Sequence, residues 1–336
     1  MRVDRKAAIK KLRTLALTSK SDVDVFRMKI EETFQTVFLP NGVEKQEVQY
    51  GEIPCDVLYP QVYSSRKVIL YIHGGSFVAG SRASYRNFCA SLANETSCRV
   101  VLPEFRLPPT HPYPASLDDI VKVFKEVYVE NQLSSDKSSS ALGFGTGVKK
   151  YDPEIIIAAD GSGASLAMAL LFKIKDMYIK GVRNVIFFSP WLDLTSDAEI
   201  IKNRKYCDEV LSGESLHRAA DLYTYAANLS NPYVSPLKAS EDDFKDLPPF
   251  YIQMGAKEIL IQQANELKAI LEKAGVECTL DVWDDMVYMF QMADEYFKES
   301  HLAMEKIGNY IVKRDTIDKK EEEERQKVLR KNDILV

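Results

Sequence analysis

Two hydrophobic patterns alternate along most of this chain. Short continuous apolar runs are typical of strands that are buried on both faces of a sheet. Between these runs, apolar residues recur at the spacing of a helix with one buried side. The runs expected as strands lie at 68–72, 99–102, the beginning of 155–170, 184–188, 250–254 and 279–283. Strands that alternate with helices in this way predict an α/β fold, with a mostly parallel sheet and helices on both faces.

The N-terminal part of the chain shows a different order of elements. Residues 1–40 have helical spacing and are expected as a helical cap, with Ser21 and Asp22 as candidate N-caps of a second helix. Residues 44–50 and 54–59 alternate between apolar and polar side chains across a short turn. This pattern predicts an antiparallel hairpin ahead of the parallel strands.

Composition along the chain suggests how the domain is bounded. The central α/β domain is placed at 41–313, after the helical cap. Within it, the Ser- and Gly-rich stretch 134–148 is expected as a surface insertion, and 196–230 as helices that lie over the sheet. Residues 314–336 are rich in both charges and are expected as a tail, either a solvated helix or disordered.

One stretch, IIIAADGSGASLAMAL at 155–170, joins a buried strand to a buried helix through a cluster of small residues. Small side chains allow the chain to turn very sharply at this point. The other Gly-rich and polar turns also follow predicted strands, at their carboxyl ends. In a sheet of this kind the functional crevice lies at that edge, so we expect the site there.

Composition and charge exclude several classes of function. The 336 residues carry a net charge of −5 and no basic stripe, which gives no support for nucleic-acid binding. The five cysteines are scattered without a C-x-x-C spacing, so a zinc site is not expected, nor is any other cofactor. No apolar run is long enough for a signal peptide or a transmembrane span. These features predict a cytoplasmic protein with reduced cysteines.

Several motifs resemble those of the hormone-sensitive-lipase-type esterases, which have the α/β-hydrolase fold. HGGSFVAGS at 73–81 is similar to their HGGG oxyanion loop, and FRLPPTHPYPA at 105–115 to their YRLAPEHPFPA segment. VWDDMVYMFQ at 282–291 is similar to VWPDMVHVFQ, which carries the catalytic histidine. SPWLDLT at 189–195 and NPYVSP at 231–236 are also family-like, so the resemblance extends from about residue 20 to 312.

The resemblance implies a position for each catalytic residue, and two of these positions are substituted. The family elbow GDSAGGNLA aligns without a gap to ADGSGASLA at 159–167, which places Gly161 where the nucleophilic serine is expected. The histidine position falls on Tyr288, and the acid position falls on Glu258, where the acid is kept. The oxyanion donors implied are the backbone N–H groups of three residues, Gly74, Gly75 and Ser162.

Ester hydrolysis by this route needs a nucleophile, a base and a group that orients the base. Gly161 has no side chain, and a tyrosine at position 288 is a poor base at neutral pH. Ser162 is an alternative nucleophile, but a shift of register by one residue would bring Asp160 into the crowded first position of the turn. The motif therefore predicts a catalytically degenerate site.

Three functions remain open on the sequence. The first is a pseudoenzyme that binds a small apolar or ester-like ligand or a partner, as the gibberellin receptors of plants bind a hormone on this fold. The second is a carboxylic-ester hydrolase with a non-standard or engineered site, and the third is an interaction protein with a closed pocket. The sequence leaves homo-oligomer formation open.

Overall fold

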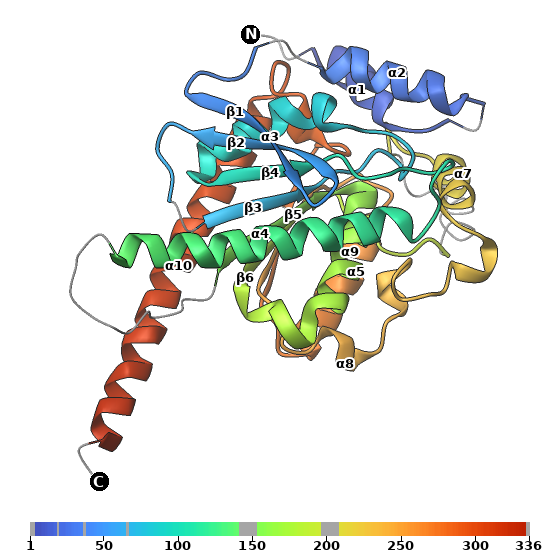
Figure 1. Cartoon of the computed structure of the whole chain (residues 1–336). Coiled ribbons are helices and arrows are strands. Elements are labelled where there is room, and N and C mark those ends of the chain that lie inside the picture. The colour runs from blue at the N-terminus through green and yellow to red at the C-terminus, as the bar shows by residue number, and fades with distance from the viewer. Residues whose placement is uncertain are drawn as a thin grey trace.

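The computed structural model describes residues 4–18, 20–35, 38–64, 67–140, 153–195 and 208–333. Its core is an eight-stranded sheet with the strand order β1-β2-β4-β3-β5-β6-β7-β8 (Figure 1). The strands are β1 (Val43–Tyr50), β2 (Ile53–Pro60), β3 (Lys67–Ile72), β4 (Arg99–Pro103), β5 (Glu154–Asp160), β6 (Val182–Phe188), β7 (Phe250–Gly255) and β8 (Cys278–Trp283). The β1–β2 and β2–β4 pairs are antiparallel, and all the other pairs are parallel.

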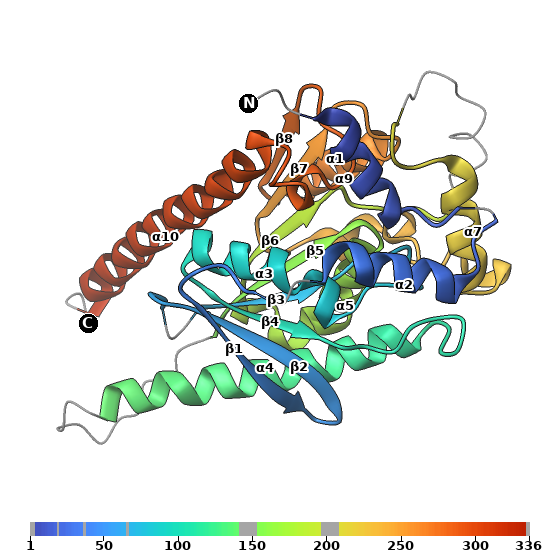
Figure 2. The ribbon, with the colours of Figure 1, turned by 90° about the horizontal axis from the view of Figure 1, so that it is seen from above.

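Helices cover both faces of this sheet. They are α1 (Arg5–Leu12), α2 (Val23–Phe34), α3 (Arg82–Thr96), α4 (Ala115–Ser140), α5 (Gly161–Tyr178), α7 (Gly213–Tyr223), α8 (Glu241–Phe244), α9 (Ile261–Lys273) and α10 (Lys298–Asp333). Figure 2 shows α3 and α10 on one side of the sheet and α4 on the other. Helix α2 packs on α3, and α5 packs on α4 and on the central strands.

The central strands and α5 form the middle of the core. Every residue of β4 and β7 is buried, as the continuous apolar runs of these strands predict for a sheet that is covered on both faces. Helix α5 is buried from Gly161 to Leu171, so almost no side of it reaches solvent. The turn between β5 and α5 is thereby fixed at the centre of the carboxyl edge of the sheet.

The α/β fold, the mostly parallel sheet and the N-terminal hairpin are confirmed. Asp22 caps α2, because its carboxylate accepts hydrogen bonds from the N–H groups of Asp24 and Val25. Within the expected surface insertion at 134–148, residues 134–140 continue α4 as helix, and residues 141–148 lie outside the described residues. The charged tail continues α10 as a helix as far as Asp333.

The expected helices at 196–230 are described only from residue 208 onward, and there α7 is present. Figure 1 shows α10 extending well beyond the sheet, with the C-terminus far from α1 and α2. In the part of the chain that the structure describes, no helix is long and apolar enough to span a bilayer.

Candidate active site

The turn from β5 to α5 has the backbone of a nucleophile elbow. Gly161 lies in the left-handed region at φ +46°, directly after the last residue of β5. Such a conformation is strained for any residue with a side chain, and nucleophile elbows hold their serine in a strained turn of this kind. The carbonyl of Gly161 accepts a hydrogen bond from Trp191 N–H at 2.9 Å, which ties the turn to the loop after β6.

The hydroxyl of Tyr288 occupies the space above Gly161. A Cβ atom at position 161 would lie well within 3.0 Å of Tyr288 Oη, closer than real Cβ contacts come. Tyr288 is 5% exposed, and burial raises the pKa of its hydroxyl well above the usual value. The hydroxyl therefore stays protonated at neutral pH, where it cannot take up a proton as a catalytic histidine would. The structure thus brings the expected nucleophile and histidine positions together, with the tyrosine filling the gap.

Glu258 lies fully buried in the turn after β7. Its Oε1 accepts hydrogen bonds from Ser189 Oγ at 2.9 Å and from Gly255 N–H at 2.5 Å. Its Oε2 is buried and has no hydrogen-bond partner among the described residues. Burial raises the pKa of this carboxyl well above its usual range, against the opposing effect of the Gly255 N–H. Glu258 does not cap α9, which begins at Ile261 after an N-cap at Leu260.

Ser162 is engaged with the loop that follows β3. Its Oγ accepts a hydrogen bond from Phe77 N–H at 2.9 Å, and its side chain is buried. Its own N–H belongs to the first turn of α5, where N–H groups have no partner within the helix. Gly75 N–H makes no hydrogen bond to the described residues. These two N–H groups fit the oxyanion role that was expected of them.

Gly74 does not fit that role. Its N–H donates to Asp160 Oδ1 at 2.8 Å, so the donor is already engaged. The backbone also comes so close here that a Cβ at position 74 would collide with the Asp160 carboxylate. The expectation of an oxyanion donor at Gly74 is therefore corrected: this N–H holds the loop against the elbow.

Asp160 is the centre of a buried hydrogen-bond cluster. Besides the Gly74 N–H, its carboxylate accepts from Tyr71 Oη at 2.8 Å and from Tyr85 Oη at 3.0 Å. Its side chain makes no capping bond to α5. Asp160 therefore does not cap α5; instead, three donors converge on its carboxylate from β3, the loop after it, and α3.

Stability should depend on pH through Asp160. Burial raises the pKa of this carboxyl to about 6 from 3.8, despite the three donors. A raised acidic pKa stabilises the fold at low pH, and that contribution is lost as the pH rises through about 6. Between pH 4 and pH 7 we expect the unfolding free energy to fall by up to roughly 3 kcal/mol relative to Asp160→Asn, which lacks the titration. Urea unfolding of both proteins at the two pH values measures this difference; parallel changes in the two would exclude Asp160 as the source.

An aromatic layer lies over the elbow. Phe77 stacks on Tyr223 of α7 with ring centres 3.9 Å apart, and Trp191 lies 5.3 Å from Phe77. Tyr113 packs edge-on against Tyr223, and its N–H donates to the Tyr223 carbonyl. Phe77, Tyr223 and Trp191 are each at most 3% exposed. The backbone N–H groups of Phe77 and Trp191 bond to Ser162 Oγ and the Gly161 carbonyl, so this buried layer is attached directly to the elbow.

No histidine is placed to act as the missing base. His73 is sandwiched between Tyr85 and Phe105, and burial lowers its pKa to about 4. His217 lies 3.4 Å from Asp221 on the exposed side of α7. Of the described residues, only Phe77 hydrogen-bonds to the Ser162 hydroxyl, so no histidine activates it.

Comparisons with known proteins agree with this architecture. A family model described as an alpha/beta hydrolase fold matches residues 69–292. A protein named esterase from Acinetobacter venetianus is 32% identical over 253 residues, covering 75% of this chain and 77% of that protein. The crystal structure of an esterase from the bacterial hormone-sensitive lipase family has a TM-score of 0.77 at 26% identity. It covers 92% of this chain and 97% of its own.

This chain belongs to the hormone-sensitive-lipase-type α/β-hydrolases. An acetyl-hydrolase from Streptomyces hygroscopicus is a further relative, 26% identical over 283 residues, with 84% of this chain and 86% of that protein covered. The esterase scaffold is therefore shown. In this hydrolase no group of three or more His, Cys, Asp or Glu among the described residues could hold a metal ion.

Sequence reasoning missed Ser189 in this hydrolase site. Its hydroxyl donates to Glu258 and accepts from Met289 N–H at 3.2 Å, so it links the acid to the segment that carries Tyr288. The signal in the sequence was the position of Ser189 at the first residue after β6, at the same edge of the sheet as the elbow. The residues that directly follow each strand at this edge of the sheet include Ser189, and this position is the signal for its role.

Proposed function

We propose that this protein is a catalytically inactive member of its family, which acts by binding and not by ester hydrolysis. The observation that carries the proposal is the Tyr288 hydroxyl in the space that a side chain at position 161 would need. Acyl transfer in this family type requires an attacking oxygen and a base that accepts its proton. Gly161 has no side-chain oxygen, and the Tyr288 hydroxyl leaves no room beside this residue for a substrate carbonyl.

The remaining groups can stabilise charge but cannot start the reaction. Losing both nucleophile and base in a comparable triad costs about 10⁶-fold in rate. The N–H groups of Gly75 and Ser162 retain at most the part of catalysis that an oxyanion hole supplies, roughly 10³–10⁴ over water. Ser162 is a poor substitute nucleophile, because its hydroxyl is buried and bound to Phe77 N–H.

The aromatic layer favours a closed elbow over an open cleft. Phe77 and Tyr223 stack almost in parallel, with an interplanar angle of 9°, and both are nearly inaccessible to solvent. A small apolar or ester-like ligand would reach the space beside Gly161 only if the Tyr288 side chain moved out of it. Binding of a partner on the outer surface needs no such movement, so the closed arrangement supports an interaction role.

The test of inactivity uses p-nitrophenyl butyrate together with a fluorophosphonate probe that labels activated serines. We expect hydrolysis within about tenfold of a protein-free blank, and no labelling. Ser162→Ala is the matched control, and it should leave the rate unchanged while weakening the fold by about 1 kcal/mol through the lost acceptor of Phe77 N–H. Turnover that disappears in Ser162→Ala, or a fluorophosphonate adduct on Ser162, would instead establish a non-standard esterase.

A further inference from the structure

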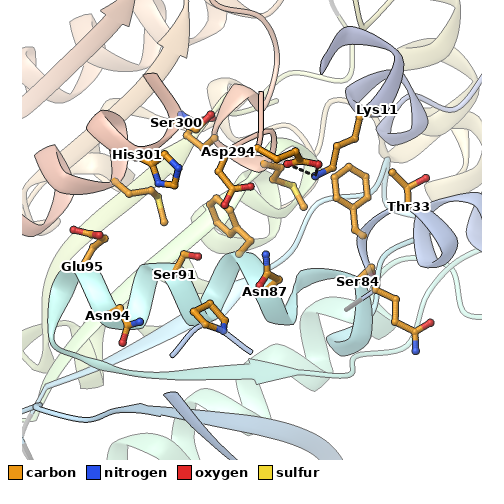
Figure 3. Close-up of a pocket in the computed structure, with 18 residues that line it drawn as sticks. Lys11, Thr33, Ser84, Asn87, Ser91, Asn94, Glu95, Asp294, Ser300 and His301 are labelled. Carbon is orange, nitrogen blue, oxygen red and sulfur yellow. Dashed lines mark hydrogen bonds and ion pairs between the residues drawn. The ribbon is translucent and has the colours of Figure 1, made fainter. Parts of the chain in front are cut away.

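A second hollow lies beside α3, away from the elbow. Its volume is about 450 Å³, within the range of small-molecule pockets. Its walls come from α3, the end of α2, and the segment from η5 (Phe290–Met292) into the start of α10 (Figure 3). Gly161, Ser162, Glu258 and Tyr288 do not line it. The pocket is therefore separate from the degenerate site.

One wall is a polar stripe on α3. Ser84, Asn87, Ser91 and Asn94 follow one another at intervals of three or four residues, which places them on one face of the helix. Figure 3 shows these side chains in a row along α3, opposite Asp294, Ser300 and His301. An apolar floor is provided by Phe34, Phe88, Met292 and Met304. Polar walls over an apolar floor are the usual lining of a small-molecule site.

Three polar groups of this pocket lack protein partners. The partly buried side chains of Asn87 and Ser91 make no hydrogen bond to any residue that the structure describes. Gln291 is only 3% exposed, and its Oε1 is buried without a partner there. Asn87 and Ser91 line the hollow with donors and acceptors that a molecule entering it can use, whereas the inaccessible Gln291 Oε1 would first have to rearrange.

The charge of the pocket favours a cation. Three carboxylates line it, on Glu95, Asp294 and Glu295, and its basic side chains are Lys11 and His301, both of which oppose the rise in the pKa of Asp294. Lys11 Nζ lies 2.6 and 2.8 Å from the two oxygens of Glu295, so that pair neutralises itself. Asp294 lies between Lys11 and His301 in Figure 3 and has no hydrogen-bonded cation among the described residues. Burial, followed by a hydrogen bond with Glu295, raises the pKa of the Asp294 carboxyl. A positive group beside it would relieve that cost.

We propose that this pocket binds a small organic cation that also carries hydroxyl groups, such as an amino sugar. Its ammonium group would pair with Asp294 in a charge-assisted hydrogen bond. Its hydroxyl groups would bond to Asn87 and Ser91, and its carbon skeleton would rest on Phe88 and the two methionines. Hydroxyls that both donate and accept match a wall made of amides and a serine hydroxyl.

The test compares glucosamine with glucose and glucuronate by ligand-observed NMR and titration calorimetry. These sugars share hydroxyl groups but carry positive, zero and negative charge. We expect glucosamine to bind at least tenfold more tightly than glucose, and glucuronate not to bind. Asp294→Asn should remove the preference for glucosamine. Asp176→Asn, which changes an exposed carboxylate on α5, should leave it intact.

A steric variant tests the location. Ser91→Phe fills the pocket from α3, and it should abolish glucosamine binding without changing the unfolding midpoint. If Ser91→Phe lowers the midpoint, Asn87→Ala is used in its place. That variant should weaken glucosamine binding at least threefold. Equal affinity for glucosamine and glucose would overturn the proposal. So would glucosamine binding that survives both Asp294→Asn and the α3 variant, or no saturable binding up to roughly 50 mM, which corresponds to a free energy near −2 kcal/mol.

Discussion

Replacing Gly161 by serine and Tyr288 by histidine together should raise p-nitrophenyl butyrate hydrolysis at least about 10³-fold above that of the unmodified protein. The double variant removes the hydroxyl that blocks position 161 and supplies a base in its place. Gly161 already has the left-handed backbone of an elbow. The buried Glu258 Oε2, which has no hydrogen-bond partner in the part of the chain that the structure describes, is the acceptor that a histidine at position 288 would need for orientation.

Single variants and one matched double variant separate the causes of this gain. Gly161→Ser alone should give no activity and should lower the unfolding free energy by roughly 1–3 kcal/mol, because the new side chain meets Tyr288. Gly161→Ser with Tyr288→Phe removes the hydroxyl without adding a base, and its rate should stay near the blank. If the serine–histidine variant is no faster than this control, the closed stack of Phe77 on Tyr223 would be the barrier, and Tyr223→Ala in the same background would be expected to release it.

Asp160→Ala should lower the unfolding free energy by roughly 3–5 kcal/mol. The change leaves three donors buried without an acceptor, on Tyr71, Gly74 and Tyr85. Urea unfolding at pH 7, followed by circular dichroism, measures the loss. Tyr85→Phe is the matched comparison, since it removes one donor and keeps the carboxylate, and should cost about 1 kcal/mol. Equal losses in the two variants would show that water replaces the carboxylate and that Asp160 is not the centre of the cluster.

The fold could be predicted from the sequence because the spacing of the apolar residues and the positions of the turn residues both match the strands and helices of the structure. β3, β4 and β7 are buried on both faces and appear as continuous apolar runs. Motif positions at the ends of strands then placed Gly161, Tyr288 and the acid at one edge of the sheet. The convergence of Gly161 and Tyr288 in the structure follows directly from that topology.

What the sequence could not supply were contacts between segments far apart in the chain. Asp160 looked like a turn residue, because nothing local indicates that Tyr71 and Tyr85 donate to it. The continuation of α4 into 134–140 was not predicted, because Ser and Asp have weak helix preference and the segment has no apolar stripe. The polar stripe on α3 could be read from spacing alone, but its meaning depends on which segments face it across the hollow.

The contact between Gly161 and Tyr288 also makes the order of the two substitutions matter if hydrolysis is to be gained one mutation at a time. A serine codon restored first would yield a destabilised protein with no gain, because the tyrosine hydroxyl stands in its way. A histidine restored first meets no such obstacle, yet it has no nucleophile to serve. On the proposed function, selection for hydrolysis therefore gains nothing from either single step, and one mutation alone does not restore activity.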